Sequence, residues 1–136
     1  MKPRVVLANG VFDILHAGHV AHLEAARELG DVLWVSVTSD YKVGKGSGRP
    51  IFPQEMRIAV LKALRCVDHA IPVDGLIEAI DFVKPHVVVK GIDYSEGLNL
   101  HHEKYCKDRG IEIRFTDTPK ISAADYLNES RRRQAV

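Results

Sequence analysis

The chain has 136 residues, of which 46% are hydrophobic and 27% are charged, the composition of an ordinary globular domain with one core. Nineteen basic and 18 acidic residues leave a formal charge of +1, which excludes a global electrostatic attraction to nucleic acid or to an anionic membrane. No apolar run approaches the ~20 residues that span a bilayer, and two cysteines cannot form a disulfide framework, so we expect one cytoplasmic domain over residues 1–136.

Short apolar runs rich in β-branched residues alternate along the chain with segments of helical periodicity. In chain order, the pattern predicts a strand at 5–8, a helix at 18–29, a strand at 32–37, a helix at 54–64, a strand at 69–73, a helix at 76–83, a strand at 86–90, a helix at 99–109, a strand at 111–115 and a helix at 125–132. Such alternation implies parallel pairing, right-handed crossovers and helices on both faces of the sheet. The sequence therefore predicts an α/β fold, a Rossmann-like three-layer architecture around a central parallel sheet.

Glycine and proline mark the ends of several predicted helices. Gly30 and Gly110 each follow a helix at the position of a C-terminal glycine cap. Pro53 opens the helix at 54–64. The apolar residues of that helix fall on one side, which is typical of a helix packed on a core: Met56, Ala59, Val60, Ala63 and Leu64.

Two segments lack a clear pattern of regular structure. Residues 42–49 are rich in glycine and basic side chains, and we expect a loop there. The chain ends in a dense basic run, Arg131 to Arg133, and residues from about 127 to 136 are expected to form a loose, solvated C-terminal tail.

Ligands of open parallel sheets bind at the carboxyl ends of the strands. Three segments directly follow predicted strands, namely residues 9–19, 38–49 and 90–94. Because these strand ends share one edge of the sheet, we expect the three segments to meet in space although they are far apart in the sequence.

The first of these segments carries the strongest chemical signal. It joins a strand to the start of a helix, where unpaired amides and the positive end of the helix dipole favour anions. His16 and His19 are three residues apart, so both imidazoles project from one side of a helical turn, and Gly18 leaves room between them. Two imidazole N–H groups would stabilise the charge that a transferring phosphoryl group develops. The pattern therefore predicts a phosphate site with a pair of catalytic histidines.

Two other interpretations of the histidine pair remain open. Histidines at a helix start also serve as capping or packing residues. Imidazole is also a common zinc ligand, but zinc requires three or four ligands. The sequence offers only Asp13 and the distant pair His101 and His102 beside the two histidines. We therefore expect no metal ion that the protein alone holds.

Residues 10–19 read G-x-F-D-x-x-H-x-G-H, which resembles the signature of the cytidylyltransferase-like nucleotidyltransferases. That family includes glycerol-3-phosphate cytidylyltransferases and heptose-1-phosphate adenylyltransferases, and the likeness covers nearly the whole chain. It implies a fold of the HUP/nucleotidyltransferase type and transfer of the NMP moiety of ATP or CTP to a phosphorylated small molecule, with release of pyrophosphate. A sugar or polyol phosphate is the implied acceptor, Mg²⁺ would arrive with the nucleotide, and the protein would be a homodimer.

The resemblance also implies roles for individual residues. His16, His19 and the loop lysine Lys45 would be catalytic. Ten residues would contact the nucleotide: Asn9, Gly10, Val11, Phe12, Gly18, Lys90, Gly91, Asp93, Ile121 and Ser122. Asp13, Asp40 and Arg57 would contact the substrate.

Two motifs, and one difference from the family's usual sequence, bear on the substrate and the activity that the resemblance implies. Residues 89–94 (V-K-G-x-D-Y) and 49–53 (R-P-x-x-P) resemble the heptose-1-phosphate adenylyltransferase branch and favour ATP. The family usually carries S-T-T at the last phosphate-binding helix start, whereas residues 122–125 read Ser-Ala-Ala-Asp. A nucleotide-binding module without turnover is therefore one alternative. Adenylyl transfer to a vitamin phosphate, such as flavin mononucleotide or pantetheine phosphate, is another, because the motif also occurs in those enzymes.

Overall fold

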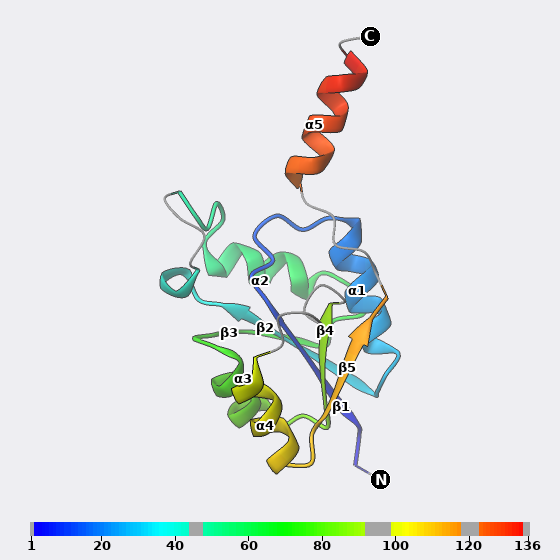
Figure 1. Ribbon diagram of the computed structural model, residues 1–136, viewed down its shortest axis with the longest axis vertical. Helices are drawn as coiled ribbons and strands as arrows, with labels where there is room; N and C mark the ends of the chain where they lie inside the picture. The colour runs from blue at the N-terminus through cyan, green and yellow to red at the C-terminus, as the bar shows by residue number, and fades with distance from the viewer. Residues whose placement is uncertain (1, 44–47, 92–98, 118–122, 135–136) are drawn as a thin grey trace.

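The computed structural model describes residues 2–43, 48–91, 99–117 and 123–134. Its elements are β1 (Val5–Gly10), α1 (Ala17–Arg27), β2 (Val32–Thr38), a short 3-10 helix η1 (Asp40–Lys42), α2 (Gln54–Lys62), β3 (His69–Val73), α3 (Leu76–Val83), β4 (Val87–Gly91), α4 (Leu100–Asp108), β5 (Glu112–Thr116) and α5 (Ala123–Gln134). The strands form one parallel sheet in the order β3-β2-β1-β4-β5 (Figure 1). The predicted parallel α/β fold is confirmed.

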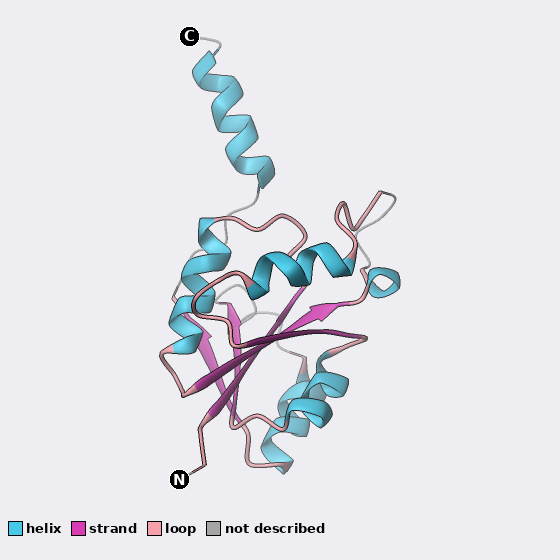
Figure 2. Cartoon of the chain, turned by 180° about the vertical axis from the view of Figure 1, so that it is seen from behind, coloured by secondary structure: helices cyan, strands magenta, loops and turns pink. Residues whose placement is uncertain are grey.

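The sheet lies between two layers of helices, as the sequence predicts (Figure 2). Side chains alternate along each strand, so neighbouring residues face opposite layers. On β1, Val6 and Ala8 pack in the core that includes Leu23 of α1 and Leu61 of α2. Leu7 points to the opposite core, which α3 and α4 complete. Because β1 is the central strand and buried on both sides, the loop that follows it has a rigid base.

Gly30 and Gly110, which follow two predicted helices, are required for different reasons. Gly110 has φ +69°, the left-handed conformation expected of a C-terminal glycine. Gly30 does not serve as such a cap, because α1 ends at Arg27 with Glu28 as its C-cap. A Cβ atom at Gly30 would lie 2.7 Å from the backbone oxygen of Arg4. Gly30 is therefore required by the close approach of two backbone segments, not by a left-handed turn.

The side of α2 that faces the core is not the side that its apolar pattern predicts. Its buried residues are Arg57 and Leu61. Four of the five residues on the predicted apolar side are exposed instead, with Met56 at 52% and Val60 at 49% exposure and with Ala59 and Ala63 also exposed. The fifth, Leu64, is partly buried and packs against the core. The sequence pattern alone could not reveal this, because α2 is apolar on two sides.

The C-terminal residues form helix α5 through Gln134, which includes the helix predicted at residues 125–132, and the run of Arg131 to Arg133 is helical and exposed. Within the described ranges, no helix combines the length and the apolar character needed to cross a membrane.

Candidate active site

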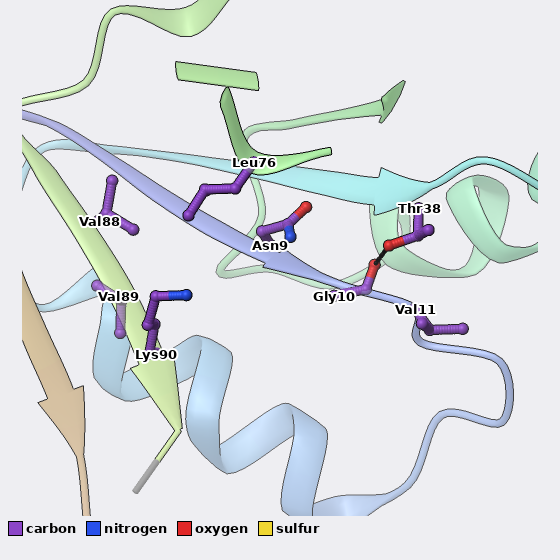
Figure 3. Close-up of a pocket in the computed structure, with 8 residues that line it drawn as sticks. All are labelled: Asn9, Gly10, Val11, Thr38, Leu76, Val88, Val89 and Lys90. Carbon is purple, nitrogen blue, oxygen red and sulfur yellow. Dashed lines mark hydrogen bonds between the residues drawn. The ribbon is translucent and has the colours of Figure 1, made fainter. Parts of the chain in front are cut away.

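A pocket opens at the carboxyl edge of the sheet, between the ends of β1 and β4 (Figure 3). It is lined by Asn9, Gly10, Val11, Thr38, Leu76, Val88, Val89 and Lys90. The hydroxyl of Thr38 donates to the Gly10 carbonyl (3.3 Å), and Ser36 Oγ donates to Asn9 Oδ1 (2.7 Å). The three predicted segments therefore meet, as far as they are described. Four of the lining residues are not among the site residues predicted from the sequence: Thr38, Leu76, Val88 and Val89.

The turn after β1 has an unusual backbone conformation at Phe12. Its φ is +51°, a left-handed angle that a bulky residue rarely adopts. The Phe12 ring is buried and lies so close to Gly10 that a Cβ there would be 2.8 Å from it. The same ring meets the imidazole of His19 edge to face, with centroids 5.6 Å apart. Phe12 thus packs against both the strand end and one of the two predicted catalytic histidines.

His16 and His19 cap the start of α1 reciprocally. His16 Nδ1 accepts from the amide of Gly18 (3.1 Å), and His19 Nδ1 accepts from the amide of His16 (3.2 Å). The two rings are partly buried and stack with centroids 3.9 Å apart. A neutral imidazole whose Nδ1 is an acceptor carries its proton on Nε2. The capping box therefore selects the tautomer in which both histidines have an Nε2–H donor.

Capping and phosphate binding are alternatives in our sequence analysis, and the geometry makes them compatible. Capping occupies Nδ1 of each ring, while an anion would bind the opposite nitrogen. The amide of Gly18, which the sequence predicts to bind the nucleotide, donates to His16 in the structure. The first turn of α1 holds no acidic residue, so no carboxylate there competes with an anion for the positive end of the helix dipole.

Asp13 joins the histidine turn to the segment before α2. Its carboxylate is buried and accepts from the amides of Ile51 (2.8 Å) and Phe52 (2.9 Å) and from Arg49 Nη1 (2.9 Å). Burial acts to raise the pKa of Asp13, but the two amides and the arginine outweigh it and hold the pKa below the ordinary 3.8. The substrate contact predicted for Asp13 stays a prediction; in the structure this carboxylate connects two loops.

Replacing Asp13 by asparagine is expected to lower the free energy of unfolding by about 2 kcal/mol at pH 7, because charge-assisted hydrogen bonds are lost. A depressed folded-state pKa stabilises above the unfolded value, and that contribution disappears as the pH falls through the folded value. The difference between wild type and Asp13→Asn should therefore be constant at neutral pH and shrink below about pH 4. Urea unfolding at pH 7, 5 and 3 measures it, and a difference independent of pH would contradict the assignment.

Arg57 is buried beneath the site. Its guanidinium donates to the carbonyls of Val11 (2.8 Å), Thr38 (2.8 Å) and Phe52 (3.0 Å). Nη2 also pairs with Asp40 (2.6 Å), whose side chain is 42% exposed, whereas that of Arg57 is 0% exposed. The substrate contacts predicted for Arg57 and Asp40 stay predictions. In the structure Arg57 ties together the ends of β1 and β2 and the start of α2.

Lys90 extends from the end of β4 toward the side of β1 that carries Asn9 and Gly10 (Figure 3). Burial lowers the pKa of its ammonium group. A bound anion would compensate this loss of hydration, so the lysine is suited to a phosphorylated ligand. Gly91 is the last residue of β4 and pairs with Thr116 of β5. Four further predicted site residues lie outside the described residues: Lys45, Asp93, Ile121 and Ser122.

Known proteins resemble this chain over most of its length. A family model described as cytidylyltransferase-like matches residues 7–123. The bifunctional protein HldE of Alcanivorax borkumensis is 46% identical over 121 residues, which are 84% of this chain and 25% of that protein. HldE of Alkalilimnicola ehrlichii is 52% identical over 115 residues, 81% of this chain and 24% of that protein. The chain thus spans about a quarter of the length of these curated relatives.

A solved structure shares the fold. The crystal structure of the lipopolysaccharide core biosynthesis protein from Thermoplasma volcanium superposes with a TM-score of 0.75 at 30% sequence identity. The likeness covers 88% of this chain and 100% of that protein. The comparisons in sequence and in structure therefore lead to the same kind of domain.

Proposed function

The chain belongs to the cytidylyltransferase-like family of nucleotidyltransferases, and from this premise we propose that it joins the NMP moiety of ATP to a sugar phosphate. The reaction begins with in-line attack of a phosphate oxygen of the acceptor on the α-phosphorus. The new P–O bond forms as the bond to the β-phosphate breaks, and pyrophosphate leaves. No proton has to be removed from the nucleophile, because a phosphate monoester is already ionised at neutral pH.

The paired histidines carry this proposal. Their Nδ1 atoms are occupied by backbone amides, and their rings stack 3.9 Å apart, so two Nε2–H donors lie side by side at the start of α1. Fixed donors stabilise developing charge better than water does, because they need no reorganisation during the reaction. A pair of neutral donors is suited to the oxygens of a phosphoryl group in its transition state.

The pocket at the carboxyl ends of β1 and β4 suits the remaining substrate groups. It is lined by the ends of β1 and β4, by Thr38 of β2 and by Leu76 of α3, so apolar and polar groups share its walls, and Lys90 supplies a cation. We assign Lys90 and Gly91 to the nucleotide, together with the strand end at Asn9 and Gly10. Lys45, Asp93 and Ser122 complete the proposed site by resemblance to the family. Both triphosphates and sugar phosphates are cytoplasmic metabolites, so we place the reaction there.

Mg²⁺ would neutralise the leaving pyrophosphate. Among the described residues, no group of three or more His, Cys, Asp and Glu side chains gathers around a site for a metal ion. The groups that we assign to the phosphates at the start of α1 are N–H donors, which suit an anion better than a cation. We therefore propose that the ion enters bound to the triphosphate and that the chain supplies the anion-binding groups around it.

A pyrophosphate-release assay tests this function. The chain is incubated with Mg²⁺ and either ATP or CTP, each with a panel of sugar 1-phosphates, glycerol 3-phosphate, flavin mononucleotide and pantetheine phosphate. We expect release with ATP and a sugar phosphate, and mass spectrometry should find the nucleotide-linked sugar. Binding of nucleotide without turnover on any acceptor would favour the module without catalysis. Turnover only with a vitamin phosphate would replace the proposed acceptor.

A further inference from the structure

His102 is partly buried and lies in the helix layer opposite to the paired histidines. It is on α4, one turn before Cys106, so both side chains project from the same face of that helix. Cys106 is buried in the core cluster that contains Val88 of β4. His102 therefore faces the sheet, whereas its neighbour His101 is exposed.

The crossover from β4 to β5 places His102 toward the carboxyl edge of the sheet. Because the two strands are parallel, α4 runs against their direction, and residues before Cys106 lie nearer the carboxyl ends of the strands. On β4, Lys90 follows Val88 on the same face of the sheet and lines the pocket (Figure 3). One step toward this edge thus leads from the buried Val88 and Cys106 to Lys90 and His102.

The surroundings of His102 oppose a positive charge on its ring. Burial lowers the pKa of His102 most, and the charges of Lys90 and His101 lower it further, whereas Glu78 of α3 raises it. Burial also lowers the pKa of Lys90. Two nitrogen groups that lose hydration at one edge of a pocket, and whose positive charges repel each other, are stabilised most by a bound anion.

The first amides of α4 already have acceptors. The amides of His101 (2.9 Å) and His102 (3.4 Å) donate to Asn99 Oδ1, and the amide of Glu103 donates to the Asn99 carbonyl (3.0 Å). An anion at this edge would therefore be bound by the side chains of His102 and Lys90 and not by the start of the helix.

The proposed reaction requires two anion sites on different sides of the α-phosphorus. In-line displacement places the attacking and the leaving oxygens opposite each other. His16 and His19 belong to the layer of α1 and α2, whereas His102 belongs to the layer of α3 and α4. Lys90 comes from the sheet that separates the two layers. If the triphosphate binds at the start of α1, the side of α3 and α4 is left for the attacking phosphate.

We propose that His102 binds the phosphate group of the acceptor, with Lys90 between this phosphate and the α-phosphate of the nucleotide. The inference rests on the proposed function and names the residue that selects a phosphorylated acceptor. The imidazole donates an N–H group to the phosphate, and the charge of the bound phosphate favours the protonated ring. A sugar without a phosphate would not make this contact.

Steady-state kinetics of the 136-residue chain test this role. His102→Asn should raise the KM of the sugar phosphate about 10- to 100-fold, the effect of losing one hydrogen bond to a charged group. The nucleotide Kd should stay unchanged, because the lost contact is to the acceptor. His102→Lys should recover part of the loss, since an ammonium group also binds phosphate. His101→Asn is the matched control, an exposed neighbour of the same type, and should change neither quantity.

The NMR titration of His102 is a second measurement, and it needs no turnover. Its Cε1–H resonance is assigned with His102→Asn, and an ATP analogue that cannot be cleaved between the α- and β-phosphates occupies the start of α1. Inorganic phosphate or glucose 1-phosphate should then raise the pKa of His102 by about one pH unit. The pKa of His101 should change much less.

The two measurements separate this inference from the proposed function. An unchanged pKa of His102 at saturating phosphate would overturn the inference, and so would a His102→Asn variant with an unchanged acceptor KM or with nucleotide binding weakened as much as acceptor binding. A wild type without turnover, whose His102 still responds to phosphate, would reject the proposed reaction and support the anion site. Thermal unfolding of each variant shows whether the fold is retained.

Discussion

Replacing either His16 or His19 by alanine should lower kcat about 10²- to 10³-fold, the effect of losing one preorganised donor to a transition-state oxyanion. Nucleotide Kd should change far less, because the lost hydrogen bond strengthens only as charge develops on the phosphoryl oxygens. Single-turnover rates and equilibrium nucleotide binding measure the two quantities separately. Equal losses in kcat and in nucleotide affinity would show that the histidines bind the ground state only.

Two further substitutions separate the capping role of His16 from its catalytic role. Asparagine provides an oxygen near the Nδ1 position and is a favourable N-cap, but it has no group at the Nε2 position. His16→Asn should therefore keep the stability of α1 and lose kcat as the alanine variant does. Glutamine places an amide N–H near the Nε2 position, so His16→Gln should recover part of kcat while the cap is weakened.

A histidine outside the site serves as the matched control. His69 is exposed at the amino end of β3 and stacks on Trp34, at the edge of the sheet opposite to the pocket. His69→Ala should leave kcat unchanged. If it lowers kcat as much as the site substitutions do, the loss reflects general destabilisation and the catalytic assignment fails.

The second large effect is expected at Arg57. Replacing it by methionine should lower the free energy of unfolding by about 3–5 kcal/mol, because three backbone carbonyls lose their donor in a buried region. Arg57→Lys should recover only part of this loss, since one ammonium group cannot reach three carbonyls in different directions. Urea unfolding of the three proteins measures the differences.

A substitution at Asp40 separates the stability that Arg57 contributes through its ion pair from the stability that it contributes through its backbone contacts. Asp40 is 42% exposed, so water screens the pair, and Asp40→Asn should cost less than about 1 kcal/mol. A loss as large as that of Arg57→Met would mean that the ion pair dominates and that the carbonyl contacts contribute little.

Local sequence patterns were sufficient to predict the order of the helices and strands and the turn that carries His16 and His19. Strand and helix periods depend on neighbouring residues, and β1 to β5 follow the predicted strands within about two residues at each end. The carboxyl ends of parallel strands share one edge of the sheet, and from this the sequence correctly predicted that the segments at Gly10 and Thr38 lie close together. The motif at residues 10–19 is contiguous, which is why the sequence alone could identify the family.

Only the tertiary structure decided which side of α2 faces the core and what Asp13 and Arg57 contact. Both sides of α2 have helical periodicity, and the buried Arg57 binds the carbonyls of Val11 and Thr38, which are distant from it in the sequence, as well as that of the nearby Phe52. Likewise, Gly30 is required by the backbone of Arg4 and not by its own helix. Periodicity and motifs report what neighbouring residues can form, whereas burial, charge pairing and close approach depend on chain segments that meet only after folding.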